Sequence, residues 1–214
     1  MRPIRLLSMP LATVLGCTLA ACSSPEPPPP FYSPHQAATR TAVPLVRPFP
    51  LVPMSEPFVL EFDLLPPGRN SSASLAIALR ATDAATGDAW DIIDKIRHSD
   101  LNATVVLTPL DAQTSVPQLY TLDFDVVGHA QQRPTVPVAA DGRVHGVMAT
   151  GVDSIALDEA GLTEPGRDYR EVAFAWAKAP PPGRYRLELQ LIDPAPELAS
   201  VPVELLLAYR RLPK

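Results

Sequence analysis

The side chains with the clearest capacity for metal or proton chemistry are the four histidines of this 214-residue chain. None has a second ligand at a spacing such as His-Glu-x-x-His. His98 lies at the end of a predicted helix, where a cation suits the helix dipole. His129 and His145 would need folding to bring them together, with Asp125 or Asp141, before they could bind zinc. We therefore expect no metal or cofactor.

The other polar residues also lack catalytic spacing. Ser154 lies in the stretch 151–155, Gly-Val-Asp-Ser-Ile, which lacks the second glycine of a nucleophile elbow. Asp91 and Asp94 share a short helix, and Asp123 and Asp125 share a strand face, where carboxylates are normally solvated. Acid–base work needs paired carboxylates in a cleft. The sequence thus predicts a domain that is not an enzyme.

The first residues have the composition of an export signal. Arg2 and Arg5 supply positive charge, and the stretch Leu6–Ala21 is apolar but interrupted by polar residues and proline. This stretch is too short and too broken to span a bilayer, which needs about 20 apolar residues. A charged start, a short apolar middle and small residues at the end are typical of a secretory signal. We therefore predict a signal peptide over residues 1–21.

The end of this signal, Leu19-Ala20-Ala21-Cys22, resembles the lipobox of bacterial lipoproteins. The resemblance implies cleavage after Ala21 and diacylation of the Cys22 thiol, usually with a third chain on the new amino group. The alternative is an ordinary cysteine behind an ordinary signal. Lipoproteins of this kind stay in the inner membrane mainly when Asp follows the cysteine, so Ser23 points to the outer membrane, facing the periplasm. Cys17 would be discarded with the signal, which leaves no disulfide.

The stretch from residue 22 to 56 is predicted to be a lipidated tether. It holds the run Pro27–Pro30 and further prolines up to Pro53, with Pro57 directly after it, and proline excludes helix and central strand. An extended polyproline spacer is the expected form. The apolar part Val43–Met54 is expected to pack along the domain as an edge segment.

The charge of the mature chain limits its partners. Loss of Arg2 and Arg5 leaves 16 basic and 23 acidic side chains, a net charge of −7. A mildly acidic domain is a poor ligand for nucleic acid.

Residues 57–214 show the pattern of one β-rich domain. Alternating apolar residues and turn signals predict strands over 58–64, 73–79, 103–107, 118–127, 143–150, 152–157, 169–177, 184–191 and 201–209. Residues 131–140 are expected to be a loop or an edge, and 159–168 a loop. One short helix is predicted over 88–98, with Trp90, Ile93 and Ile96 on one stripe. It is expected to be a lid over the sheet, or alternatively a docking surface around Trp90.

Many short strands and little helix indicate an all-β, immunoglobulin-like antiparallel sandwich. The Pro-Gly-x-Tyr entry at 182–185 resembles the late strands of such sandwiches, which places Tyr185 in a tyrosine corner. The chain as a whole resembles an uncharacterised family of β-sandwich lipoproteins of Gram-negative bacteria. The resemblance rests on 58–63, on 88–98, on 182–187 and on 195–203. It implies the fold and carries over no catalytic or binding residue.

These features together favour a lipid-anchored envelope protein that binds another envelope or secreted protein. An accessory of a secretion system and a protein that neutralises a toxic effector both fit this description. Two alternatives stay open at this point. One is an envelope hydrolase with a dispersed site, and the other is a carrier of an apolar ligand inside the sandwich.

Overall fold

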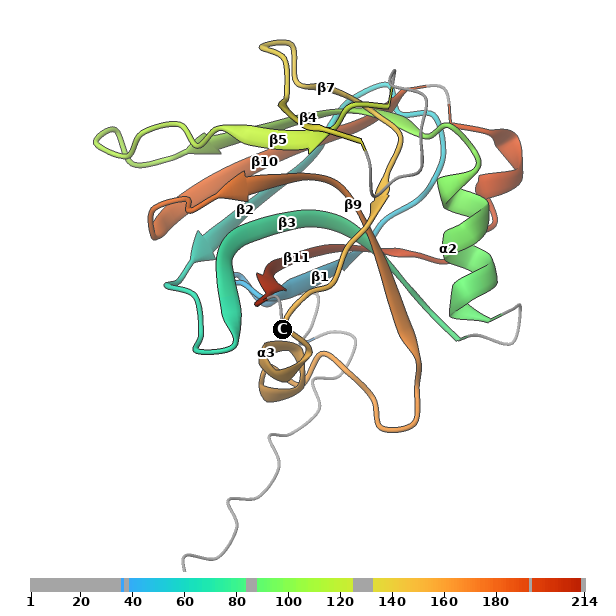
Figure 1. Ribbon diagram of the computed structural model, residues 1–214, viewed down its shortest axis with the longest axis horizontal. Coiled ribbons are helices and arrows are strands. Elements are labelled where there is room, and N and C mark those ends of the chain that lie inside the picture. The colour runs from blue at the N-terminus through green and yellow to red at the C-terminus, as the bar shows by residue number, and fades with distance from the viewer. Residues whose placement is uncertain (1–35, 37–38, 84–87, 125–132, 193, 213–214) are drawn as a thin grey trace, which may run out of the picture.

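A computed structural model of the chain describes residues 36, 39–83, 88–124, 133–192 and 194–212 (Figure 1). The elements in chain order are β1 (Leu45–Pro48), β2 (Phe58–Leu64), β3 (Ser71–Thr82), α2 (Ala89–Arg97), β4 (Asn102–Pro109), β5 (Leu119–Leu122), β6 (Thr135–Pro137), β7 (Arg143–His145), β8 (Met148–Ala149), α3 (Ser154–Glu159), β9 (Tyr169–Lys178), β10 (Gly183–Ile192), the 3₁₀ turn η2 (Pro196–Leu198) and β11 (Glu204–Arg211). The predicted signal peptide, Ala21, Cys22, Ser23, His35, Asp125 and His129 lie outside the described residues.

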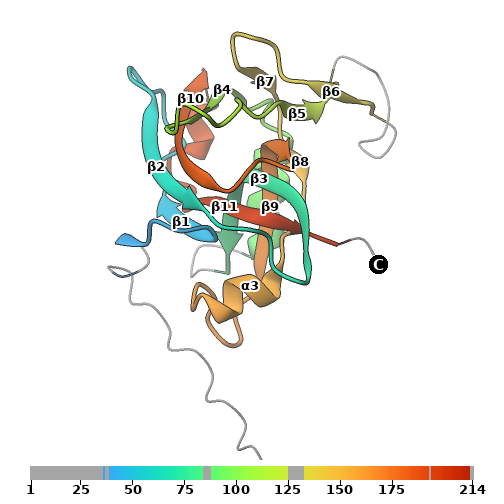
Figure 2. The same ribbon diagram turned by 90° about the vertical axis from the view of Figure 1, so that its left-hand side faces the viewer.

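The strands form two sheets that face each other (Figure 2). One has seven strands in the order β1-β11-β3-β9-β5-β6, with β8 also paired to β9. The other has four, in the order β2-β10-β4-β7. Every pairing between named strands is antiparallel. The predicted all-β antiparallel sandwich is therefore confirmed.

Alternation along the strands fills the space between the sheets. On β10, Tyr185, Leu187, Leu189 and Leu191 are buried, and the residues between them are not. The Tyr185 hydroxyl donates a 2.7 Å hydrogen bond to the carbonyl of Pro181, four residues back, which confirms the predicted tyrosine corner. The Tyr185 ring stacks on the buried ring of Phe62.

Some predicted strands differ in extent from the observed ones. The predicted strand over 143–150 is divided into β7 and β8 at Gly146, which has a φ of +69° and an ideal Cβ position 3.1 Å from the Phe124 ring. A side chain there would meet both strain and a ring. β11 begins at Glu204, just after Pro202, which has no N–H for the ladder. Of the strand predicted over 118–127, the structure describes β5.

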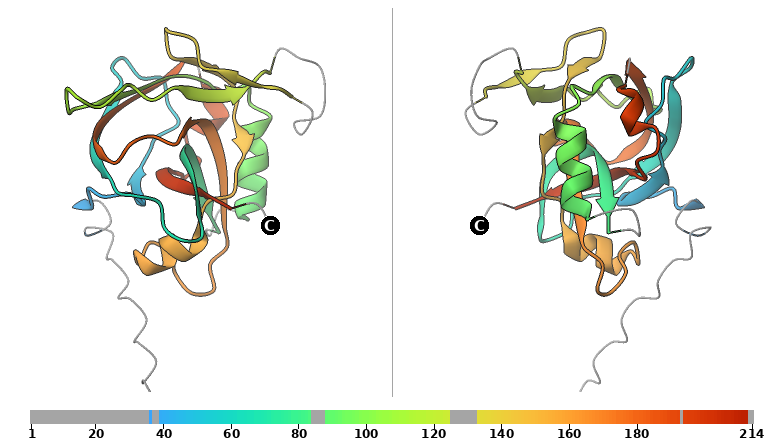
Figure 3. Two further views of the ribbon diagram at one scale, coloured as in Figure 1. Left: turned by 60° about the vertical axis from the view of Figure 1, so that its left-hand side comes forward. Right: turned by 90° about the vertical axis from the view of Figure 1, so that its right-hand side faces the viewer.

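The predicted helix is confirmed as α2, which stands along the side of the sandwich (Figure 3). The Asp88 carboxylate accepts a 2.8 Å hydrogen bond from the Trp90 amide and so caps the helix start. Ile93 and Ile96 are buried in the core. The spacing places Trp90 on the same buried stripe, but its side chain is 55% exposed and stacks under Arg170 at 4.5 Å. Ala89 and Ile92 of the same turn are buried, so the stripe that packs on the core is Ala89, Ile92, Ile93 and Ile96, and the Trp90 ring lies outside it.

The strand predicted over 152–157 is wrong, because this segment contains the helix α3. The Asp153 carboxylate accepts hydrogen bonds from the amides of Ile155 and Ala156, at 3.1 and 3.3 Å. It is itself held by the Ser71 hydroxyl at 2.6 Å. This cap favours a helix over the β-branched preference of Val152 and Ile155. α3 lies across the outer side of the seven-stranded sheet and buries Leu157 there (Figures 2 and 3).

The apolar end of the predicted tether is part of the fold, as expected for an edge segment. β1 pairs with β11, and Val43, Leu45, Phe49 and Leu51 are buried. Ordered packing therefore begins upstream of the domain boundary predicted at residue 57. Among the described residues, every helix is too short or too polar to cross a membrane.

Candidate functional site

A row of charged side chains crosses the outer face of the seven-stranded sheet. Glu204 on β11 is the register partner of Arg80 on β3, and Arg80 is in turn the partner of Glu171 on β9. Directly paired residues project to the same face, so the three side chains lie next to one another. Two residues further along this face, β3 has Ala78 and β9 has Ala173, and these small side chains leave room for α3.

Arg80 is the centre of this row and is only 3% exposed. Its Nε and Nη2 atoms donate to one carboxylate oxygen of Glu204, at 2.9 and 2.6 Å, and Nη1 donates to the Leu162 carbonyl at 2.8 Å. Its guanidinium lies 4.6 Å from the centroid of the Tyr169 ring. Arg80 therefore fastens the segment that follows α3 to the sheet.

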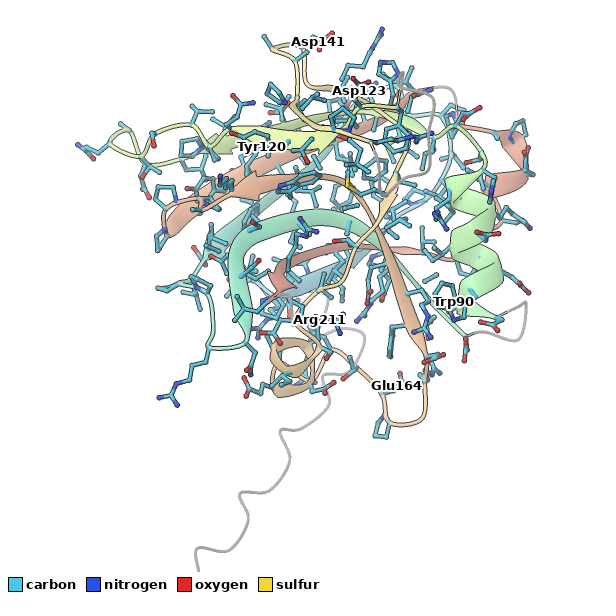
Figure 4. The ribbon with its side chains drawn as sticks, viewed as in Figure 1. Trp90, Tyr120, Asp123, Asp141, Glu164 and Arg211 are labelled. Carbon is cyan, nitrogen blue, oxygen red and sulfur yellow. The ribbon has the colours of Figure 1, made fainter. Side chains whose placement is uncertain are left out.

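A cavity of about 640 Å³ opens beside the row, between α3, the 163–168 loop, the start of β9 and the end of β11. The loop is held by its own contacts. Glu164 forms a 2.8 Å ion pair with Arg167, and its amide donates to the Tyr169 hydroxyl at 3.1 Å. Figure 4 shows Glu164 on this loop, with Arg211 closer to α3. The cavity is thus bounded by a loop with fixed internal contacts.

Glu171 lines the cavity, and burial raises the pKa of its carboxyl group. The positive charges of Arg80, Arg170 and Arg211 oppose that rise in pKa. Such a carboxyl can exchange a proton at a higher pH than a solvated glutamate. Ser154 lines the same cavity, but the residues described around it include no histidine to act as its base.

The described residues among those considered for a zinc site make other contacts. The Nδ1 atom of His145 lies 3.2 Å from the side-chain oxygen of Asn102, and Asp141 accepts the Arg143 amide at 3.0 Å. Figure 4 shows Asp141 at the tip of a projecting turn. Within the described ranges, no three His, Cys, Asp or Glu residues are grouped to hold a metal ion. His129 and Asp125 lie outside those ranges.

The carboxylates of α2 are at the surface, as predicted. Asp94 lies 3.4 Å from Arg97 and 3.7 Å from His98, both within one helical turn. These exposed pairs stabilise a helix only weakly.

No described helix packs on the outer face of the four-stranded sheet, in contrast to the face beneath α3. Arg184, Arg186 and Glu188 project outward from the central strand β10, and Arg186 forms a 2.9 Å ion pair with Glu188. Arg184 lies 3.4 Å from Glu61 and 3.7 Å from Asp63 of β2. All five side chains reach solvent.

Exposed aliphatic side chains flank these charges. Val59 of β2 and Val106 of β4 are the register partners of Glu188 on its two sides, and both are exposed. Leu65 and Leu110 continue the outward alternation just beyond the same strands and are also exposed. We call this surface the open face and define it by Val59, Glu61, Asp63, Leu65, Val106, Leu110, Arg184, Arg186 and Glu188.

Comparison of the chain with protein-family models, with characterised proteins and with solved structures finds no match. The resemblance to a lipoprotein family therefore stays a prediction, and the candidate sites depend on the geometry alone.

Neither the charged row nor the open face was predicted from the sequence. Arg80 is visible as a charge at the end of the apolar run 75–79, which is a signal for a buried ion pair. The outward residues of β2 and β10 are visible as the polar half of each alternation. Which sheet face stays uncovered depends on where α3 packs, and α3 was not predicted.

Proposed function

We propose that this protein is an exported lipoprotein, anchored in the cell envelope by lipid on Cys22, whose sandwich binds another envelope or secreted protein without catalysing a reaction. The outer membrane, facing the periplasm, is the proposed location, on the basis of Ser23. The open face is the observation that carries the binding role.

The composition of the open face supports this role. Protein interfaces combine apolar groups with arginine and are poor in lysine. The open face has four exposed aliphatic side chains around Arg184 and Arg186, and no lysine belongs to it. Contiguous apolar groups left on a surface mark interaction sites more often than scattered ones do. A partner that covers Val59 and Val106 would also desolvate the Arg186–Glu188 pair between them, which adds specificity.

Neither alternative is favoured by an observation. A hydrolase would need a nucleophile beside its base, and no described contact joins Ser154 or Glu171 to such a group. A carrier would need space between the sheets, where Phe62, Tyr185 and Phe174 are packed with almost no exposure.

The binding role is tested by placing a photo-crosslinking amino acid at Val106 in the full-length chain, expressed in the native envelope. Ile155 on α3 is a matched control, because it is also an exposed aliphatic side chain, at 48% against 40% for Val106. We expect one discrete adduct from position 106 and none from position 155. Equal labelling at both positions, or none at position 106, would contradict the proposal.

The anchor is tested separately by Cys22→Ser. We expect the variant to leave the membrane fraction, because it lacks the thiol to which the acyl chains that hold the protein in the membrane would be attached. Mass spectrometry of the native N-terminus should show a modified residue 22. An unmodified thiol there, or unchanged fractionation of the variant, would refute lipidation.

A further inference from the structure

We propose that the partner adds an extended segment to the free edge of β2, as one more strand of the four-stranded sheet. This inference rests on the proposed function and specifies how the partner is held. The occupant is a protein segment that alternates apolar and basic residues.

The free edge is shown by the hydrogen bonds of Asp63. Its amide donates to the Thr41 carbonyl at 2.8 Å, and its carbonyl accepts from the Val43 amide at 3.0 Å. Its backbone groups therefore point away from β10. Groups two residues apart along a strand point the same way, so those of Val59 and Glu61 also face outward.

Chain pairing covers this edge at one end only. Ala42 forms a single parallel bridge with Asp63, and the chain continues from there to β1. No described residue forms a hydrogen bond with the outward backbone groups of Val59 or Glu61. The protein thus already shows how a second segment can join β2, and it leaves the rest of the edge open.

The other sheet edges are protected, which sets β2 apart. β1 ends in Pro48, β6 is three residues long and ends in Pro137, and β7 is only three residues long. Proline and short length are the usual means of blocking strand addition. β2 has seven residues and no proline among them.

The side chains beside the edge define the chemistry of the occupant. On the outer side, Glu61 and Asp63 share one guanidinium, that of Arg184, so one carboxylate remains in excess. A lysine or arginine on the added strand would lie beside Glu61 and complete the pairing. On the inner side, Phe58 and Leu60 form the border of the core, where alternate apolar residues would pack. The net charge of −7 on the chain without Arg2 and Arg5 also favours a basic segment.

Glu61→Pro is the decisive variant. It removes an N–H that points away from β10, so the ladder between β2 and β10 keeps its bonds. The probe is a fluorescent five-residue peptide of alternating valine and lysine, matched to Phe58–Phe62, the part of β2 that Ala42 leaves unpaired. We expect the full chain to bind it and Glu61→Pro to bind it about tenfold more weakly, since one strand hydrogen bond and one ion pair are lost. Glu61→Gln separates these two losses, because it keeps the N–H and removes the charge.

Two controls make the result decisive. A peptide with glutamate in place of lysine should bind at least about tenfold more weakly. The urea midpoint of Glu61→Pro should stay near that of the wild type, which shows that β2 is intact. A peptide that fails to bind the wild type, or that binds a folded Glu61→Pro equally well, would overturn the inference.

The crosslink from position 106 distinguishes this inference from the proposed function. If the adduct persists at full yield in Glu61→Pro, the open face binds a partner and the edge does not. If no adduct forms in the wild type, the proposed function fails, and the peptide titration alone decides on the edge. An adduct with the mass of two copies of this chain would overturn the basic partner in favour of self-pairing.

Discussion

Replacement of Arg80 by methionine would test the charged row beneath α3. Methionine keeps much of the length and packing of arginine, but it removes the charge and all the donors. The change breaks three hydrogen bonds, two to Glu204 and one to the Leu162 carbonyl, together with the stacking on Tyr169. We expect the segment after α3 to lose its attachment to the sheet.

The size of the effect follows from the exposure of the partners. Removing one member of a buried ion pair typically costs about 3 to 5 kcal/mol, because the other charge is left desolvated. The Glu204 side chain is 37% exposed, so water can replace part of the lost contact. We therefore expect a loss at the low end, about 3 kcal/mol in the free energy of unfolding. Arg80→Lys keeps the positive charge but loses the planar, forked guanidinium. Its free energy of unfolding should therefore fall between that of the wild type and that of Arg80→Met.

The assay is urea unfolding of the chain from residue 22 with Cys22→Ser, followed by circular dichroism. A lower midpoint with an unchanged slope would show a loss of stability in a state of equal compactness. Arg186→Met is the matched control, because the Arg186–Glu188 pair is half-exposed on the open face and should contribute less than about 1 kcal/mol. The reasoning is refuted if Arg80→Met costs no more than Arg186→Met.

Three further predictions concern side chains of the core and the turns. Burial and the neighbouring Tyr185 raise the pKa of Tyr209 to about 12. The stability that the protonated Tyr209 contributes is therefore intact below pH 10 and is lost as the pH rises toward 12. In unfolding curves across this range, Tyr209→Phe should remove that share of the alkaline loss, roughly 2 to 3 kcal/mol. Tyr185→Phe deletes the corner hydrogen bond and should cost about 1 to 3 kcal/mol at neutral pH; a midpoint equal to the wild type would contradict this. Gly142→Ala would place a Cβ 2.9 Å from the Val105 carbonyl at positive φ, whereas Gly166 has positive φ and open space, so Gly142→Ala should lower the urea midpoint further than Gly166→Ala does.

Local patterns were enough to predict most of the strands. The alternation of Tyr185, Leu187, Leu189 and Leu191 specifies both a strand and its buried face, because side chains alternate across a sheet with a period of two. The tyrosine corner was predictable for a related reason. Its donor and acceptor are four residues apart, so their contact needs little of the remaining fold.

Contacts between distant segments could not be predicted from local patterns. The segment of α3 has the β-branched residues Val152 and Ile155, which favour a strand, and its helix cap depends on Ser71, which is 82 residues away from Asp153. Trp90 fits the three-residue spacing of Ile93 and Ile96, but the face of α2 that packs on the core also contains Ala89 and Ile92, and this orientation leaves the Trp90 ring exposed.

The sequence by itself determined a series of half-buried strands, and it predicts an export signal with a lipobox-like end, which stays a prediction. Each of these depends on residues that are neighbours in the chain. Only the tertiary structure decided which sheet face α3 covers and that Arg80 joins Glu204 across 124 residues. It also decided that the described residues pair with the outer edge of β2 only at Asp63. The physical reason is that periodicity shows which side of a strand is apolar, while the order of strands and the residues that meet across them depend on packing between segments far apart in sequence.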